Sequence, residues 1–337
     1  MRARLRDALL GLEPAAAALL GTSVARVLAR AWRRRGCVVL CYHAVREPGP
    51  YDDPSVVVSP GRFADQVRFL AERCEVVGLD RVLEPDSRRP RVAITFDDGY
   101  RDLLDHALPV LARHGAPSAV FCVSDVVEGR RALWTDALAA AIDRAPAGAY
   151  ELPGLGPVEV GDAPSRAVAF QRARAVCGAA EEPVAASEGV LSSLPAAAPP
   201  ADLYLHSDDL PEAEALGAEI GSHARTHARL SALDRDALAG ELRHSHDVLG
   251  RSGRAVRAVA YPYGDAGSVP TAVVDAAREA GYQLGFTGVA GLASPAADPL
   301  AVPRVAIRCR DGSRAFRGKA AGAQPAVYAR AARAVAS

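Results

Sequence analysis

The chain has 337 residues, half of them hydrophobic and 24% charged, which is the composition of an ordinary globular protein with at least one sizeable core. Lys and Arg together number 40, as do Asp and Glu, so the formal net charge is zero. This balance excludes the basic excess of a nucleic-acid-binding protein and the acidic tail of a disordered segment, and we expect no nucleic-acid partner.

The first 35 residues form a segment of their own. Arginines at positions 2, 4 and 6 precede an uncharged run over residues 14–25, and five more arginines follow before residue 36. The uncharged run is too short to span a bilayer. We interpret residues 1–35 as an uncleaved helical segment that packs on the domain or associates peripherally with a membrane. The expected location of the protein is therefore cytoplasmic or membrane-associated.

Strand and helix patterns alternate from residue 36 onward. Short apolar runs predict strands over residues 38–42, 75–79, 91–96, 117–123, 219–222, 255–261, 283–287 and 301–307. Amphipathic patterns predict helices over residues 60–72, 101–114, 233–249 and 269–281. This alternation predicts a parallel α/β sheet or barrel over residues 36–312.

Residues 146–205 interrupt the alternation. They are rich in Ala, Pro, Gly and Glu and show weak hydrophobic periodicity. We predict an insertion into the domain, helical over residues 164–176 and otherwise loop. The Arg- and Ala-rich residues 313–337 are predicted to form a C-terminal helical tail.

Two adjacent carboxylates, Asp97 and Asp98, follow a predicted buried strand and precede Gly99. In parallel α/β barrels, catalytic groups lie at the C-terminal ends of strands. Because adjacent side chains point in different directions, one carboxylate can hold a metal while the other faces the metal-bound water. A pair of Asp residues before a helix is also a common N-cap, and the motif alone does not decide between the two roles.

A pair of histidines, His223 and His227, follows a second predicted strand. On a helical turn, positions i and i+4 share one face and can hold one ion, although eight histidines can produce this spacing by chance. With Asp98, the pair offers two nitrogens and one oxygen and leaves a position for water, as catalytic zinc sites do. Other divalent ions suit the same ligands.

In chain order, the stretches 95–100 (TFDDGY), 223–227 (HARTH) and 260–264 (AYPYG) resemble successive motifs of the polysaccharide deacetylases. This group is also known as the NodB-homology group or carbohydrate esterase family 4. The resemblance covers about residues 36–310. It implies a distorted (β/α) barrel with fewer than eight complete units, and hydrolysis of N-acetyl groups on hexosamine polymers or glycan intermediates.

The resemblance also assigns roles to individual residues. Motif matching makes Asp97 the general base and makes Asp98, His223 and His227 the ligands of a divalent metal, with Zn²⁺ as the first choice. The expected substrate is an N-acetylated glycan or polysaccharide. Its groove is expected to be lined by side chains that include Tyr261, Pro262, Tyr263 and Arg304. Trp134 is a further candidate to stack on a sugar face, with a partly buried core Trp as its alternative.

The chain lacks two residues that many family members use. Many members carry an Arg in the third motif that orients the base, where this chain has Ala260, and we expect Arg304 to replace it. Many members also use a C-terminal His as general acid, and residues 303–308 contain none. The stretch around His43 (CYHAV) resembles the opening of a circularly permuted branch typified by the poly-N-acetylglucosamine deacetylases. His43 is therefore the expected general acid, with a capping or core His as its alternative.

Two other functions remain open at this stage. A metal-dependent amidohydrolase acting on small cyclic amides would use a similar ligand set. A non-catalytic glycan-binding homologue would keep the fold without turnover. The intact set of Asp and His residues argues against the second, whereas the missing Arg and C-terminal His argue for it.

Overall fold

The structure is a computed structural model that describes residues 36–53, 56–85 and 89–322. The predicted N-terminal helix with its membrane contact (1–35), and residues 323–337 of the predicted tail, lie outside the described residues. None of the helices in the described part of the chain combines the length and apolar character needed to cross a bilayer.

A parallel sheet forms the centre of the molecule, in the order β11-β10-β9-β6-β5-β1-β12, with β4 beside β5. Its strands are β1 (Cys37–Tyr42), β4 (Glu75–Val76), β5 (Arg91–Phe96), β6 (Ser118–Cys122), β9 (Ala218–Ser222), β10 (Ala258–Ala260), β11 (Leu284–Phe286) and β12 (Val305–Ala306). Two small sheets pair β2 (Ala44–Val45) with β3 (Val57–Val58), and β7 (Gly148–Leu152) with β8 (Gly156–Val160).

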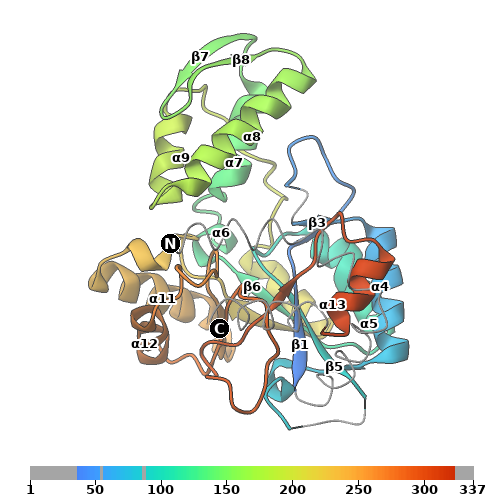
Figure 1. Ribbon diagram of the computed structural model, residues 1–337. Coiled ribbons are helices and arrows are strands. Elements are labelled where there is room, and N and C mark those ends of the chain that lie inside the picture. The colour runs from blue at the N-terminus through green and yellow to red at the C-terminus, as the bar shows by residue number, and fades with distance from the viewer. Residues whose placement is uncertain (1–35, 54–55, 86–88, 323–337) are drawn as a thin grey trace, which may run out of the picture.

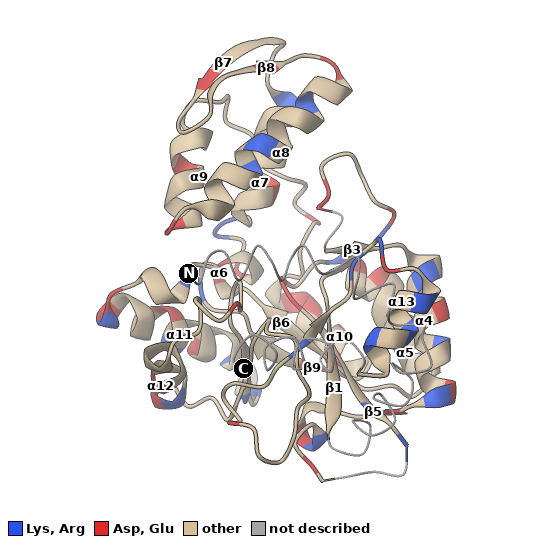
Figure 2. Ribbon diagram, in the orientation of Figure 1, with Lys and Arg blue, Asp and Glu red and all other residues tan. Residues whose placement is uncertain are grey.

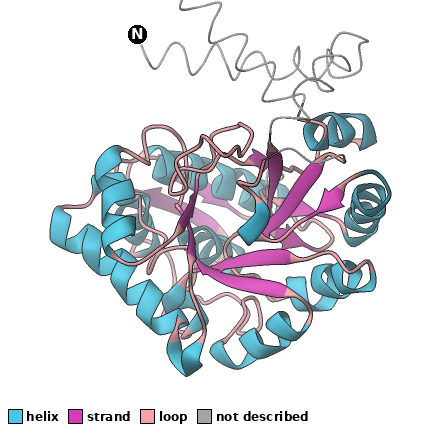
Figure 3. Ribbon diagram, turned by 90° about the horizontal axis from the view of Figure 1, so that it is seen from below, coloured by secondary structure: helices cyan, strands magenta, loops and turns pink. Residues whose placement is uncertain are grey.

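Helices surround the sheet (Figure 3). They are α4 (Pro60–Arg73), α5 (Leu108–Arg113), α6 (Ser124–Val127), α7 (Trp134–Arg144), α8 (Ala163–Ala179), α9 (Pro183–Leu191), α10 (Leu210–Ala215), α11 (Arg235–Leu249), α12 (Thr271–Glu279) and α13 (Ser313–Ala320). Single turns are η1 (Leu79–Arg81), η2 (Leu103–Ala107), η3 (Ser207–Asp209), η4 (Leu230–Ala232) and η5 (Arg251–Gly253).

The sheet curls into a distorted barrel. The first strand, β1, lies between β5 and β12 and pairs with β5 along its whole length. At the other edge, Val302 bonds to β11: its N–H donates to Gly285 O at 2.7 Å, and its carbonyl accepts from Thr287 N at 2.9 Å. Residues 302–306 thus contact both β11 and β1 and bring the two edges of the sheet together. The predicted distorted (β/α) barrel is confirmed.

Burial on both faces explains the continuous apolar runs of the strands. Every residue of β1, β5 and β6 is buried, because helices cover the outside of the barrel and side chains fill its interior. Charged residues gather instead on the outer helices, such as α4, α12 and α13 (Figure 2). Strands covered in this way form a rigid frame that holds the residues at their ends in place.

The helix predicted over residues 101–114 is divided into two parts. A π-helical turn, η2, precedes α5, and Pro109 occupies the first turn of α5. Proline has no N–H to donate to the carbonyl four residues back, so a regular α-helix cannot run through this point. The predicted strands 75–79 and 255–261 are also shorter in the structure, at two and three residues.

The segment between β6 and β9 forms a separate lobe above the barrel, made of α7, β7, β8, α8 and α9 (Figure 1). It has its own hydrophobic core, in which Trp134, Leu138, Ile142 and Phe170 pack together. The predicted helix 164–176 lies within α8, but the remainder holds a hairpin and α9 as well as loop. The buried face of α8 contains alanine, whereas Val168 and Val176 are exposed. The two faces of the helix therefore differ little in hydrophobicity, and the sequence shows no clear helical period here.

Candidate active site

The residues singled out from the sequence meet at the C-terminal ends of neighbouring strands. Asp97 and Asp98 follow β5, His223 follows β9, and His43 follows β1. All line one cleft with a volume of about 480 Å³. Parallel strands bring their carboxyl ends to the same edge, so side chains far apart in sequence share this cleft.

Backbone strain is concentrated here. Within the described residues, the non-glycine positions with positive φ are Asp98 (73°), Ala224 (61°), His227 (63°) and Tyr263 (63°). All four belong to the motifs around the cleft. Such left-handed conformations cost free energy and persist where the surrounding structure enforces them, most often at functional sites.

Asp98, His223 and His227 are placed to hold one cation. Asp98 Oδ1 lies 3.6 Å from His223 Nε2 and 3.5 Å from His227 Nε2. Two ligand atoms about 2.1 Å from a tetrahedral ion lie about 3.4 Å apart, which matches both distances. Asp98 Oδ1 is buried and has no hydrogen-bond partner. A cation between the three side chains would satisfy it, so these residues fit a divalent metal.

The protonation states support the same conclusion. His223 Nδ1 donates to Ala260 O at 2.7 Å, because a carbonyl can only accept, and this leaves Nε2 free to bind a metal. Burial lowers the pKa of both His223 and His227, which keeps the rings in the neutral, metal-binding form. Burial, with Asp97 nearby, raises the pKa of Asp98 well above its ordinary value. A bound cation would offset this cost.

The expected helical turn over His223–His227 is wrong. The segment is an irregular loop with left-handed residues at Ala224 and His227. It is held by Glu241 of α11, whose carboxylate accepts from Arg225 N at 3.1 Å, Thr226 N at 3.0 Å and Thr226 Oγ1 at 2.8 Å. The loop wraps around this carboxylate, and that shape, not a helix, turns both imidazoles toward Asp98. Local pattern offers no sign of Glu241.

Asp97 is held by Arg304, 207 residues away. The guanidinium Nη1 and Nη2 donate to Asp97 Oδ1 and Oδ2, each at 2.7 Å, and the Arg304 Nε donates to Thr287 O at 3.1 Å. Both side chains are buried. Burial alone would raise the pKa of Asp97, but the Arg304 guanidinium and neighbouring His223 hold it well below its usual range. Arg304 thus makes the contact with Asp97 that the expected orienting role requires.

His43 and Cys41 border the same carboxylate. One ring nitrogen of His43, the Cys41 sulfur and one Asp97 oxygen lie within 4.8 Å of one another. The Cys41 thiol donates to Asp97 Oδ2 at 3.4 Å, a contact that the sequence motifs do not indicate. His43 Nδ1 is buried without a hydrogen-bond partner, and burial lowers the pKa of this ring to about 4.

Aromatic side chains form part of the cleft wall. Trp134 Nε1 donates to Tyr263 OH at 3.1 Å, and the Arg229 guanidinium lies 4.5 Å from the centre of the Tyr263 ring. Tyr261 borders the cleft but is almost fully buried, and its hydroxyl donates to Leu300 O at 2.8 Å, which fits a packing role. Of the expected groove residues, Pro262 alone does not line the cleft.

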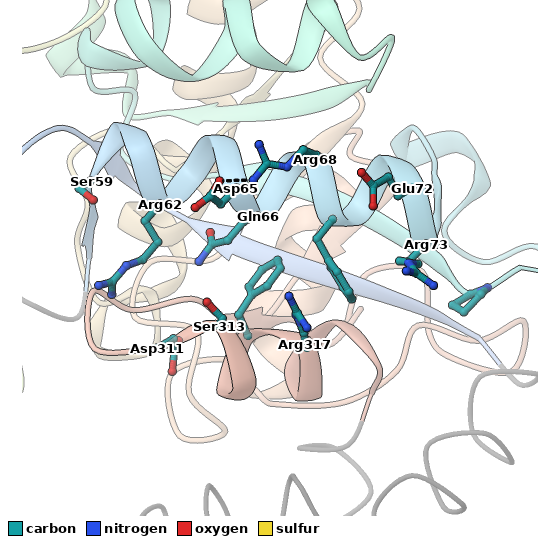
Figure 4. A pocket seen from close by; sticks show the side chains of 13 residues that line it. Ser59, Arg62, Asp65, Gln66, Arg68, Glu72, Arg73, Asp311, Ser313 and Arg317 are labelled. Carbon is teal, nitrogen blue, oxygen red and sulfur yellow. Dashed lines mark hydrogen bonds and ion pairs between the residues drawn. The ribbon is translucent and has the colours of Figure 1, made fainter.

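A larger cavity of about 1000 Å³ lies away from these residues, between α4 and α13 (Figure 4). Its wall contains none of the expected site residues. A second acidic cluster, Asp125 and Glu128 with His244, is bound by arginines: Arg225 contacts Asp125 at 3.2 Å, and Arg251 pairs with Glu128. These cations already neutralise the carboxylates, so the cluster is an ion-pair network. The strand-end cleft therefore remains the candidate active site.

Comparisons with known proteins bear on the family and the fold of the chain. The family model described as "Polysaccharide deacetylase" matches residues 84–151 and 186–285. The gap between the two matched segments lies in the lobe and contains α8. No curated protein matches the chain.

Solved structures share the fold at low sequence identity. The Streptococcus pyogenes deacetylase PplD, in complex with acetate, aligns with TM-score 0.57 and 18% identity over 84% of this chain and 97% of that chain. IcaB from Ammonifex degensii aligns with TM-score 0.55 and 19% identity, over 86% and 97%. The BpsB deacetylase domain from Bordetella bronchiseptica aligns with TM-score 0.50 and 17% identity, over 80% and 94%. The chain belongs to the polysaccharide deacetylase family.

Proposed function

We propose that the protein removes N-acetyl groups from N-acetylhexosamine-containing glycans in a reaction that depends on a divalent metal, with Zn²⁺ as the first choice. The observation that carries the proposal is the convergence of Asp98, His223 and His227 on one point beside Asp97. The fold-level similarity to a deacetylase solved with acetate supports the choice of an acetyl substituent.

In this proposal a cation bound to Asp98, His223 and His227 supplies Lewis acidity toward water and the acetamide carbonyl. Asp97 accepts the proton of the attacking water, and Arg304 holds its carboxylate in one orientation. His43 donates a proton to the leaving amine. Because its ring is neutral near pH 7, it must first gain that proton, and we assign the source to Asp97, which has an oxygen within 4.8 Å of a His43 ring nitrogen. Trp134 and Tyr263 line the cleft in which the sugar would bind.

The test compares Asp98→Ala and Asp97→Asn with the wild-type protein, measuring bound metal by mass spectrometry and acetate release from N-acetylglucosamine oligomers. We expect Asp98→Ala to lose both metal and activity. Asp97→Asn should keep the metal and lose about 10²–10⁴-fold in kcat, the range for a general base. His244→Ala, outside the cleft, is the control.

Three results would contradict the proposal. One is full metal content and full activity in Asp98→Ala. Another is turnover of small cyclic amides without acetate release from any glycan, which identifies an amidohydrolase of another specificity. The third is glycan binding without any acetate release, which would identify a non-catalytic homologue.

A further inference from the structure

We propose, on the basis of the function proposed above, that the lobe roofs the cleft, so that a glycan enters by one end and loses the acetyl group of its terminal sugar. An open groove would instead let a long chain lie across the site and react at interior sugars. The contacts that hold the lobe over the cleft favour entry by one end.

One face of α8 lies over the cleft. Phe170, Arg174 and Gly178, spaced four residues apart, all line it together with Asp97 and Asp98. Side chains four apart lie on the same side of a helix, so this face is directed into the cleft along about two turns. Figure 1 shows the lobe above the ends of the barrel strands.

The roof is anchored on the β1 side by the loop that follows β2. Arg174 forms an ion pair with Asp53 of this loop. Tyr51 of the same loop donates to Asp143 of α7 at 2.8 Å, and its ring contacts that of Phe170 edge-on, with centres 6.0 Å apart. Loop and lobe therefore meet at the wall of the cleft that contains the two carboxylates.

The roof is also anchored on the opposite side, above β9 and β10. Trp134 at the start of α7 donates to Tyr263, which follows β10, and Gly178 O accepts from Arg229 at 3.4 Å. The lobe thus touches the barrel on both sides of the metal ligands. The rest of the lining includes Gly288, Ala306 and Arg308, which follow β11 and β12, and we infer access from that side.

A cleft bridged in this way has one accessible side and a closed far end. Tyr100, Arg46 and Asp136 line the closed end, where Tyr100 donates to Asp136 at 3.1 Å and Arg46 lies 4.8 Å from the Tyr100 ring. A glycan can place its last sugar beside Asp97, but its chain cannot continue past the bridge. The substrate class is therefore a chain end or a short glycan.

The direct test uses the N-acetylglucosamine hexamer and locates the lost acetyl group by tandem mass spectrometry. We expect the wild-type protein to deacetylate one terminal sugar at least about tenfold faster than any interior sugar. Comparable rates at interior sugars would overturn the roof while leaving the deacetylase function intact. Absence of acetate release from every glycan would instead reject the function itself.

A double variant tests the contacts between the lobe and the loop that follows β2. The double substitution Tyr51→Ala with Arg174→Ala removes the ion pair and the ring contact, and we expect it to raise the ratio of interior to terminal deacetylation about tenfold. Arg172→Ala, on the exposed face of α8, is the matched control and should leave the ratio unchanged. The ratio is independent of any general loss of rate. A folded double variant, judged by circular dichroism and melting, that keeps the wild-type ratio would overturn the proposal.

Discussion

Arg304 and Asp97 form a buried ion pair at the candidate active site. The two side chains are buried and joined by two hydrogen bonds, so the pair is worth little as net stability but fixes the orientation of the carboxylate. Removing the guanidinium altogether would leave the Asp97 charge buried and uncompensated, which would lower the free energy of unfolding by about 3–5 kcal/mol. A folding defect would then accompany any catalytic defect. A conservative change is therefore the informative one.

We expect Arg304→Lys to lower kcat by about 10–100-fold while metal content and melting temperature stay near wild type. Lysine keeps the charge but cannot form the two parallel bonds that orient Asp97. Steady-state kinetics with metal analysis measures the effect, and Arg314→Lys on the exposed face of α13 is the control. Wild-type kcat in Arg304→Lys would remove Arg304 from any positioning role.

Burial should also make the thiols of Cys37, Cys41 and Cys122 unreactive. Burial raises the pKa of Cys37 and Cys122 to about 12, and burial together with Asp97 raises that of Cys41 well above its ordinary value. The thiolate is the reactive form, and four pH units below the pKa only about one thiol in 10⁴ is ionised. We expect iodoacetamide at pH 8 to label the half-buried Cys309 first.

Peptide mass spectrometry measures this labelling, and the same reaction in urea, where all six cysteines should react, is the control. Raising the pH toward 12 should increase labelling of Cys37 and Cys122, because the thiolate fraction rises as the pH approaches the pKa. Equal labelling of Cys41 and Cys309 in the folded protein at pH 8 would contradict the burial of Cys41.

At the scale of elements, the ligand loop depends on a helix that carries no ligand. The loop between β9 and η4 owes its shape to Glu241 of α11, which receives three hydrogen bonds from Arg225 and Thr226. Left-handed residues flank this anchor at Ala224 and His227. The loop therefore stores strain that the carboxylate holds in place.

We expect Glu241→Ala to weaken metal binding about 10–100-fold, the usual effect of losing a group that orients metal ligands. Removing the carboxylate frees three donors and lets His227 leave its strained conformation. Zinc titration against a competing chelator measures the affinity. Asp236→Ala, exposed on the same helix, is the control and should bind metal like the wild type. Unchanged affinity in Glu241→Ala would show that packing alone holds the loop.

At the scale of the molecule, barrel and lobe have separate hydrophobic cores, and polar and ring contacts join the two parts. One of the polar contacts is made by Asp136 in the first turn of α7, which accepts from Tyr204 at 2.6 Å and from Tyr100 at 3.1 Å. The rings of Tyr100 and Tyr204 stack with their centres 5.6 Å apart. Units with separate cores open with different free energies, so we expect the lobe to open before the barrel.

We expect Asp136→Ala to speed hydrogen exchange in the lobe while leaving β5 and β6 protected. The change leaves the buried hydroxyls of Tyr100 and Tyr204 without their acceptor, and each loss should lower the stability by about 1–3 kcal/mol. Exchange followed by mass spectrometry measures both regions, with Arg144→Ala at the exposed end of α7 as the control. Equal acceleration in lobe and barrel would show that the two unfold as one unit.

The sequence indicated the barrel because its strands are buried on both faces and separated by amphipathic helices, patterns that depend on neighbouring residues alone. The motifs around Asp97 and His223 were visible for the same reason: each is contiguous in the chain. The lobe was seen only as an interruption, since the alanine-rich helix around Phe170 carries little hydrophobic contrast. The helical turn over His223–His227 was wrong because a distant carboxylate, Glu241, dictates the loop.

The sequence by itself therefore determined the fold class, the family and the chemical groups available. The tertiary structure decided which of those groups meet: the joining of Arg304 to Asp97, the place of His43 beside them, and the passage of α8 over the cleft. The physical reason is that such contacts link segments up to about 200 residues apart. Their formation depends on how the sheet closes and how the lobe packs, and no local pattern records either.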